Sequence, residues 1–492
     1  MTLGSIGKST YSKAVSSLIH RICDVTAVAD SVYEQAAVYF QQAQAQQAQK
    51  TELAQQVMLF ENRQQQASQR DKALVERNLK QAQTEQQSFQ LAREDEASVR
   101  MASLKRLCLD ILQLCQGESV EEINLLSAKL LGTIQLLSPT EGKNVAAANQ
   151  KSKHLYKAVL SLRLLDKLLT DGELNNAYVQ QRIIASKAKK DETDETDEYD
   201  AFRDDVQIPL LIAALLQDIG CCHPDAQLIL KGADGKADEF RVLENDERIT
   251  LLQISFREGL KYITEGLGTE RYTGNSREQR DLHVKREAER QNFVLFMLKN
   301  AVKPEHGIGN LLKIPQIYTS VVLSTKANYS YEALPKVALV LEKGVEKGVY
   351  SKVAVDALLT ITGVFPQGYG VTYIPKDSDR QDLDRYEYAI VTGLYPADIR
   401  QPVCRMVTRN LTYNVSAMGC VISIENNLYY PPARKKLERI SEERLLEILS
   451  KLVSNFEERK NMSLLPKCWH PDEYFSVVKN QNLWNKVVVH NN

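Results

Sequence analysis

The sequence predicts a mainly α protein with a small β-extension toward its C-terminal end. No glycine or proline occurs between Val32 and Gln116, and apolar residues recur at helical spacing through much of residues 151–364. From 365 to 430 the pattern changes to period two. Three-four spacing is typical of amphipathic helices, and alternation with period two is typical of strands.

The first predicted segment is a glutamine-rich helical arm over residues 1–100, opened by a short helical leader at 1–32. Of the 50 residues from 41 to 90, 17 are Gln, and much of the rest is Ala, Glu, Lys and Arg, which favour one or two long helices. The apolar spacing is too ragged for a long regular coiled coil. Two interpretations stay open: a helical hairpin, self-folded or intermolecular, with a thin apolar seam, or a partly disordered tract. Either one would serve presentation or oligomerisation, because the segment has no group suited to catalysis.

A helical connector is predicted over residues 101–150, followed by a helical domain over 151–364. Ser119 with Glu122 is a capping-box signature that opens a helix through Leu137. Within the helical domain, residues 191–200 include seven acids in ten. Such a run is usually a solvated loop, and the alternative is a docking site for a basic partner.

The period-two region predicts a small β-subdomain over residues 365–432, with strands at 371–374, 388–391, 403–407 and 420–424. A helical tail is predicted over 433–492. Its first helix should start near Arg434, and its end, from Trp469 on, should dock and carry one more amphipathic helix.

Length and charge set broad limits. At roughly 150 residues per domain, 492 residues predict about three domains, or two domains and an extended element. The 62 Lys and Arg balance 63 Asp and Glu, which argues against a protein that coats nucleic acid.

The remaining compositional signals favour a cytoplasmic protein. The eight cysteines contain no CxxC pair and are expected to be reduced thiols. The N-terminal residues lack a continuous apolar stretch, so no signal peptide is expected. The longest apolar run, at residues 208–216, is far shorter than the roughly 20 residues of a membrane span, so no transmembrane segment is expected.

One stretch resembles a known family. Residues 210–220, Leu-Leu-Ile-Ala-Ala-Leu-Leu-Gln-Asp-Ile-Gly, resemble the helix ending in His-Asp-Ile-Gly that marks HD-GYP domains. These are metal-dependent phosphodiesterases of the HD superfamily that hydrolyse cyclic di-GMP in bacteria. Flanking segments that resemble the same family are His154 in an opening helix and residues 251–259, 314–323, 350–368, 387–391 and 400–405. The resemblance covers about residues 151 to 430 and implies an HD-type helical bundle.

The metal ligands that the resemblance implies are mostly missing. Gln217 stands where the family has the His of its His-Asp pair, so that only Asp218 remains, and the later helix His falls on Ser255. The family's His-His-Glu cluster falls near Lys299, whose cation would repel metals. His154 and Asp218 alone do not hold the two or three divalent ions that activate the attacking hydroxide. No metal and no cofactor are therefore expected.

Other candidate ligands are weaker. His223, in the sequence Cys-Cys-His-Pro-Asp, could join a thiolate in an unusual metal site, but the turn is expected to point away from the bundle. His283 and His306 lie in charged stretches and are expected to be exposed. No phosphate-binding loop or nucleophile motif is found.

Three functions follow. The preferred hypothesis is a catalytically inactive HD-GYP-like protein, a scaffold or protein-interaction module in bacterial signalling, with the N-terminal helices as a possible surface for homo-oligomers. The alternatives are a receptor that binds cyclic di-GMP without hydrolysis, through residues such as Arg257 or Lys299, and a divergent phosphodiesterase using His154 and Asp218. None of the three involves nucleic acid.

Overall fold

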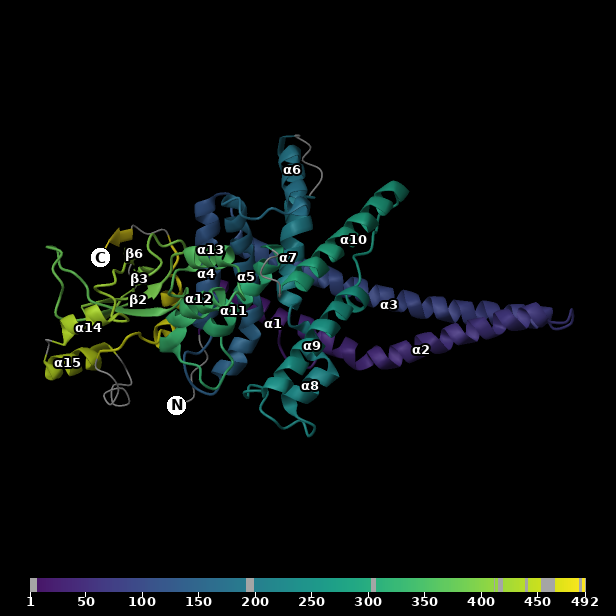
Figure 1. Cartoon of the computed structure of the whole chain (residues 1–492), viewed down its shortest axis with the longest axis horizontal. Helices are drawn as coiled ribbons and strands as arrows, with labels where there is room; N and C mark the ends of the chain where they lie inside the picture. Colours follow the sequence, from purple (N-terminus) through teal and green to yellow (C-terminus); the bar gives the residue numbers. More distant parts are fainter. Residues whose placement is uncertain are drawn as a thin grey trace. The chain divides into compact units, whose positions relative to one another are not determined.

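The computed structural model describes residues 7–191, 199–301, 307–410, 412–414, 419–438, 441–452, 465–485 and 489–491. The acidic run at 191–200 and His306 lie largely or wholly outside these residues. The protein is mainly helical with a few short strands near its C-terminal end, as the sequence predicts (Figure 1).

The chain divides into two compact units, each assembled from segments far apart in sequence. The first unit comprises Met1–His20, Leu109–Thr193 and Lys299–Asn492, and the second comprises Arg21–Cys108 and Asp194–Leu298. The five segments predicted from composition partition the chain differently, since residues 151–364 contribute to both units.

The first unit is built around a helix that is buried along most of its length. Helix α5 (Val145–Thr170) packs against α4 (Val120–Leu137), α11 (Gly307–Val322) and α13 (Lys352–Thr362). As predicted, α4 begins after Ser119, whose hydroxyl accepts a hydrogen bond from the backbone N–H of Glu122 at 3.2 Å. The Glu122 carboxylate in turn accepts from the N–H of Glu118, one residue earlier than a full capping box requires. Other described helices of the unit are α1 (Thr10–Ile22, to His20 in this unit), α6 (Ala177–Asp191), η4 (Tyr331–Lys336) and α12 (Val337–Glu346).

A five-stranded sheet in the order β1-β2-β3-β6-β7 completes the first unit. Its strands are β1 (Gly370–Tyr373), β2 (Glu387–Val391), β3 (Val403–Met406), β6 (Gly419–Val421) and β7 (Val489–Asn491). Neighbours pair antiparallel except β6 and β7, which are parallel. Along β2, Tyr388 and Ile390 belong to one apolar cluster, and Ala389 and Val391 belong to another. Alternate side chains point to opposite faces of a strand, so both faces of this sheet are covered.

The C-terminal tail supplies much of that cover. The indole of Trp469 stacks on Tyr388 with ring centroids 4.7 Å apart, and its Nε1–H donates to the carbonyl of Ala389 at 2.8 Å. The tail is thus docked, as predicted, and it contains α17 (Asp472–Ser476) and the turn η5 (Val478–Gln481). Helix α14 (Pro431–Leu437) starts at Pro431, three residues before the predicted Arg434, because proline suits the first turn of a helix. Helix α15 (Glu442–Leu452) and the strands β4 (Thr408–Arg409) and β5 (Thr412–Tyr413) also belong to the described part of this unit.

The second unit contains the glutamine-rich arm. Helices α2 (Val32–Gln66) and α3 (Lys72–Cys115, of which residues 72–108 belong here) meet at the connection 67–71 (Figure 1). A complete capping box of Ser31 and Glu34 starts α2. Within residues 41–90, all of which the structure describes, Leu79 and Ala82 are the only buried residues. The arm is therefore helical, as one of the two sequence interpretations predicts, and it buries few side chains along its outer part.

The base of the second unit consists of shorter helices. They are the π-helical turn η1 (Arg203–Gln207), α7 (Ile208–Leu216), η2 (Ile219–Cys222), α8 (Pro224–Lys231), α9 (Asn245–Lys261), the π-helical turn η3 (Tyr262–Gly266) and α10 (Arg277–Asn300, to Leu298 in this unit). Tyr33, Ala36 and Phe40 of α2 are buried in this base, and the hydroxyl of Tyr33 donates to the carbonyl of Leu215 at 2.9 Å.

The apolar run at 208–216 lies in a longer helical segment than the sequence predicts. Residues Arg203–Cys222 form 20 helical residues, long and apolar enough to span a membrane by length and composition. However, 78% of the 18-residue apolar window within that segment is buried inside the protein.

Candidate functional site: a buried ion-pair network beside an apolar hollow

The positions singled out by the HD-GYP resemblance are divided between the two units. Gln217, Asp218, Ser255 and Arg257 belong to the second unit, whereas His154 belongs to the first. Lys299 begins the last segment of the first unit and is exposed.

His154 is a core histidine in α5. It is fully buried, on the helix that also carries Tyr156, whose ring stacks on Tyr318 of α11. Its surroundings are thus those of the first unit's packed interior.

The segment Asp218-Ile219-Gly220 forms a close helix contact. Gln217 ends α7, and Asp218 precedes η2, which packs on α9. A Cβ atom added at Gly220 would lie 2.0 Å from the carbonyl oxygen of Ser255, so only glycine permits this backbone approach. Ser255 is buried, and its hydroxyl accepts from the thiol of Cys221 at 3.3 Å.

Asp218 lies near the buried base of the arm. Burial, and then the Asp218 carboxylate, raise the pKa of Tyr33, whose hydroxyl stays protonated and bonded to Leu215. The charge of Asp218 therefore helps to keep the hydroxyl of Tyr33, in α2, protonated.

His223 has a structural role. It is the N-cap of α8, where its Nδ1 accepts from the N–H of Asp225 at 3.2 Å, and its ring packs against Phe40 with centroids 5.4 Å apart. Burial raises the pKa of the neighbouring Cys222 thiol, which opposes formation of a thiolate ligand. Among the described residues, no three His, Cys, Asp or Glu side chains gather where they could hold a metal ion.

Arg257 is an exposed residue with a local partner. Its side chain is 64% exposed, and its Nε lies 2.7 Å from a carboxylate oxygen of Glu258. The two cations proposed from the sequence as dinucleotide contacts, Arg257 and Lys299, thus belong to different units.

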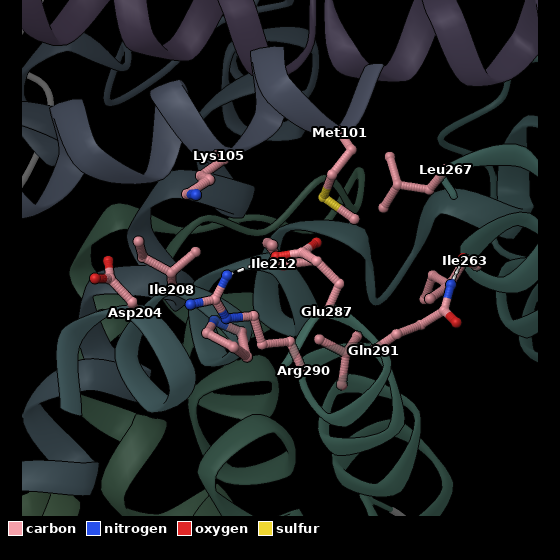
Figure 2. A pocket seen from close by; sticks show the side chains of 12 residues that line it. Met101, Lys105, Asp204, Ile208, Ile212, Ile263, Leu267, Glu287, Arg290 and Gln291 are labelled. Carbon is pink, nitrogen blue, oxygen red and sulfur yellow. Dashed lines mark hydrogen bonds and ion pairs between the residues drawn. The ribbon is translucent and has the colours of Figure 1, made fainter. Parts of the chain in front are cut away.

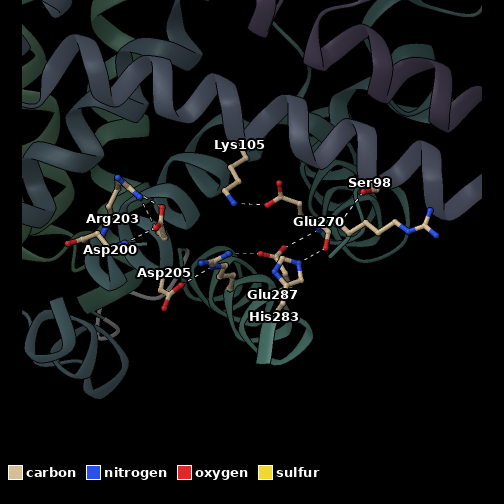
Figure 3. Close-up of polar contacts among 11 residues, drawn as sticks. Ser98, Lys105, Asp200, Arg203, Asp205, Glu270, His283 and Glu287 are labelled. Carbon is tan, nitrogen blue, oxygen red and sulfur yellow. Dashed lines mark hydrogen bonds and ion pairs between the residues drawn. The ribbon is translucent and has the colours of Figure 1, made fainter. Parts of the chain in front are cut away.

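The most distinctive polar arrangement of the second unit centres on Arg290 in α10, whose partners Asp205 and Glu287 are labelled in Figure 3. Its Nε donates to Asp205 of η1 at 2.8 Å, and its Nη1 donates to Glu287, one turn earlier, at 2.5 Å. The side chains of Arg290, Asp205 and Glu287 are 14%, 4% and 7% exposed. Burial alone would lower the pKa of Arg290, but the two carboxylates outweigh it and raise the pKa above its usual range.

The network extends to α3 and to the loop before α10. Glu287 accepts from the N–H of Glu270 at 3.1 Å, and the Glu270 carboxylate accepts from Lys105 of α3 at 2.6 Å. His283 bonds the carbonyl of Glu270 at 2.8 Å through Nε2. His283 is half-buried, so the prediction that it is exposed was wrong, because the loop at residue 270 folds over α10.

An apolar hollow lies beside this network (Figure 2). It leaves about 30 Å³ for the centres of water-sized molecules. A buried water needs roughly 10–15 Å³ by the same measure, so the hollow has room for about two waters. Its lining side chains are Met101, Lys105, Asp204, Ile208, Pro209, Ile212, Ile263, Leu267, Glu287, Arg290, Gln291 and Val294.

The charges around the hollow are engaged with one another. Lys105 pairs with Glu270, Arg203 with Asp204, and Arg290 with Asp205 and Glu287. Such an arrangement fixes α3, η1 and α10 together; it does not present a lone charge to a substrate.

Sequence reasoning missed this network. The signal that could have indicated part of it is the i, i+3 pair Glu287 and Arg290, immediately before the apolar end of α10. Its partner Asp205 is 85 residues away in sequence, and no local pattern links the two.

Comparisons of the chain with models of protein families, with curated proteins and with solved structures found no match. The resemblance to HD-GYP domains therefore rests on the sequence motifs named above.

The helix contact at Gly220 predicts a difference between two glycines. Gly220→Ala should lower the free energy of unfolding of the second unit by about 1–3 kcal/mol or more, because the methyl group meets the backbone of α9. Gly259→Ala is the control, since its Cβ would meet its nearest atoms at 3.7 Å, an ordinary contact. The control should be neutral or stabilising by up to about 1 kcal/mol. The free energy of unfolding of both variants is measured by urea unfolding, monitored by hydrogen exchange in α9. Equal losses of stability in the two variants would contradict the contact.

The ion-pair network predicts a second contrast, between two arginines of α10. Arg290→Met should lower the free energy of unfolding by about 3–5 kcal/mol, because it leaves two buried carboxylates without their cation. Arg280→Met removes an arginine that is 58% exposed, so it should change the free energy of unfolding by less than about 0.5 kcal/mol. Hydrogen exchange of α10 and η1 under urea reports the difference. Similar values for the two variants would show that the network is not stabilising.

Proposed function

We propose that the protein is a catalytically inactive, HD-GYP-like interaction module that acts as a scaffold in bacterial signalling. The proposal is supported mainly by the packing roles of the residues that stand at the HD-GYP-like positions. Gly220 and Ser255 serve the packing of η2 on α9, and Gln217 supplies an amide where a metal site needs an imidazole.

The arm supports the binding part of the proposal. At about 1.5 Å per residue, the 35 residues of α2 extend for about 50 Å. The outer part of the arm contains few buried side chains, so it contributes little to the core of the second unit. A long polar helix pair of this kind is suited to contacts with other molecules. The exposed large apolar side chains that α2 and α3 offer along the arm are Val38, Met58, Leu59, Leu74, Leu91 and Val99.

The inactive character is tested on the purified full-length chain. Elemental analysis should find iron, manganese and zinc well below one ion per chain, and incubation with cyclic di-GMP and added manganese should release no linear dinucleotide. The control is the same assay with an active HD-GYP enzyme. Two metals per chain with turnover abolished in Asp218→Ala would overturn the proposal. Tight calorimetric binding of cyclic di-GMP without turnover would favour the receptor.

The scaffold part is tested by shortening the arm. Removing residues 44–57 and 81–94, two heptads from each helix, keeps the anchored base and the connection of the hairpin. Proteins that the full chain retains from its native host should be lost by this variant, while the melting temperature of the base changes little. The control is Leu91→Ala, which keeps the full length. Retention of the same proteins by the shortened arm would place the binding surface elsewhere.

A further inference from the structure

Helix α9, which is labelled in Figure 1, exposes a row of large apolar side chains. Ile249, Leu252 and Phe256 are 46%, 59% and 45% exposed. They are spaced by three and four residues and therefore lie along one face of the helix. We call these three residues the α9 stripe.

The stripe is not the face by which α9 packs in the second unit. That face carries Ile254, Ser255, Glu258 and Gly259, which are buried. Helix α9 thus carries large apolar side chains on a second side, which the described residues of the unit leave exposed. Contiguous exposed apolar side chains on a folded protein are typical of interaction sites.

The charges that flank the stripe indicate what covers it. Asp246 and Arg257 are eleven residues apart, about three helical turns, so they lie on the same flank of the stripe near its opposite ends. In an antiparallel pair of identical helices, the same flanks face each other with their ends reversed. The Asp246 of each copy then faces the Arg257 of the other.

We propose that a second copy of this chain docks on the α9 stripe, with the two α9 helices antiparallel about a two-fold axis near Leu252. Ile249 of one copy packs on Phe256 of the other, and two Asp246–Arg257 pairs close the flank. Each copy uses the same surface, as a closed dimer requires. Arg257 also pairs with Glu258 of the buried face at 2.7 Å, but its side chain is 64% exposed and so stays accessible to a second carboxylate.

A single helix covers less than the roughly 800 Å² per partner of a standard interface, so association should be weak and depend on concentration. The proposal is independent of the arm and of the scaffold function. The arm could bind other proteins whether or not α9 pairs with itself.

Charge reversal in the full-length chain tests the geometry. Asp246→Arg alone brings two arginines together in each pair, and Arg257→Asp alone brings two aspartates together. Each variant should weaken self-association about tenfold in sedimentation equilibrium. An equimolar mixture of the two variants restores opposite charges in both pairs, so the mixture should dimerise like the original chain.

Recovery in the mixture separates a contact from a folding defect, because a misfolded chain would not recover. Leu252→Asp should also abolish association, while Leu91→Asp, on the arm, should leave it unchanged. A chain that is monomeric at all concentrations overturns the proposal, as does a mixture that stays monomeric. A dimer lost in Leu91→Asp and kept in Leu252→Asp overturns it too, since the arm would then be the interface.

Discussion

The backbone contact between Gly220 and Ser255 is the constraint on which the base of the second unit depends. Helices in contact are usually separated by their side chains, but η2 and α9 approach until a single methyl group would clash with a carbonyl oxygen. This approach fixes the direction of α9. It therefore also fixes which side of α9 is buried and which side carries the exposed stripe.

The same contact gives the Asp-Ile-Gly segment a structural role that needs no metal. In the sequence, this segment suggests a degraded catalytic motif. In the structure, the glycine is required by packing, and the pKa of Tyr33 at the base of the arm is raised first by burial and then by the aspartate. A motif of this kind can thus persist through packing alone, so its presence is weak support for hydrolysis.

The sequence predicted features that depend on neighbouring residues. The cap at Ser119, the helices of the arm and the four main strands of the sheet were all recognised from local spacing and residue type. The sequence did not predict that each unit combines segments far apart along the chain, nor that β7 pairs parallel with β6. Pairing between distant segments leaves no periodic signal. The same limit applies to the candidate site. The motif positions could be named from sequence, but Arg290 meets Asp205 only after folding.

The two exposed surfaces of the second unit differ in what they can contribute to binding. The outer arm is rich in amides and poor in apolar side chains, so contacts along it gain little from the hydrophobic effect and depend on many hydrogen bonds over a long surface. The α9 stripe is short but apolar, and burying three large side chains releases more free energy per residue. Its flanking charges then determine orientation, since oppositely charged pairs contribute more to specificity than to affinity. A protein with both surfaces can associate with itself through a compact apolar contact while its extended polar arm engages a different partner.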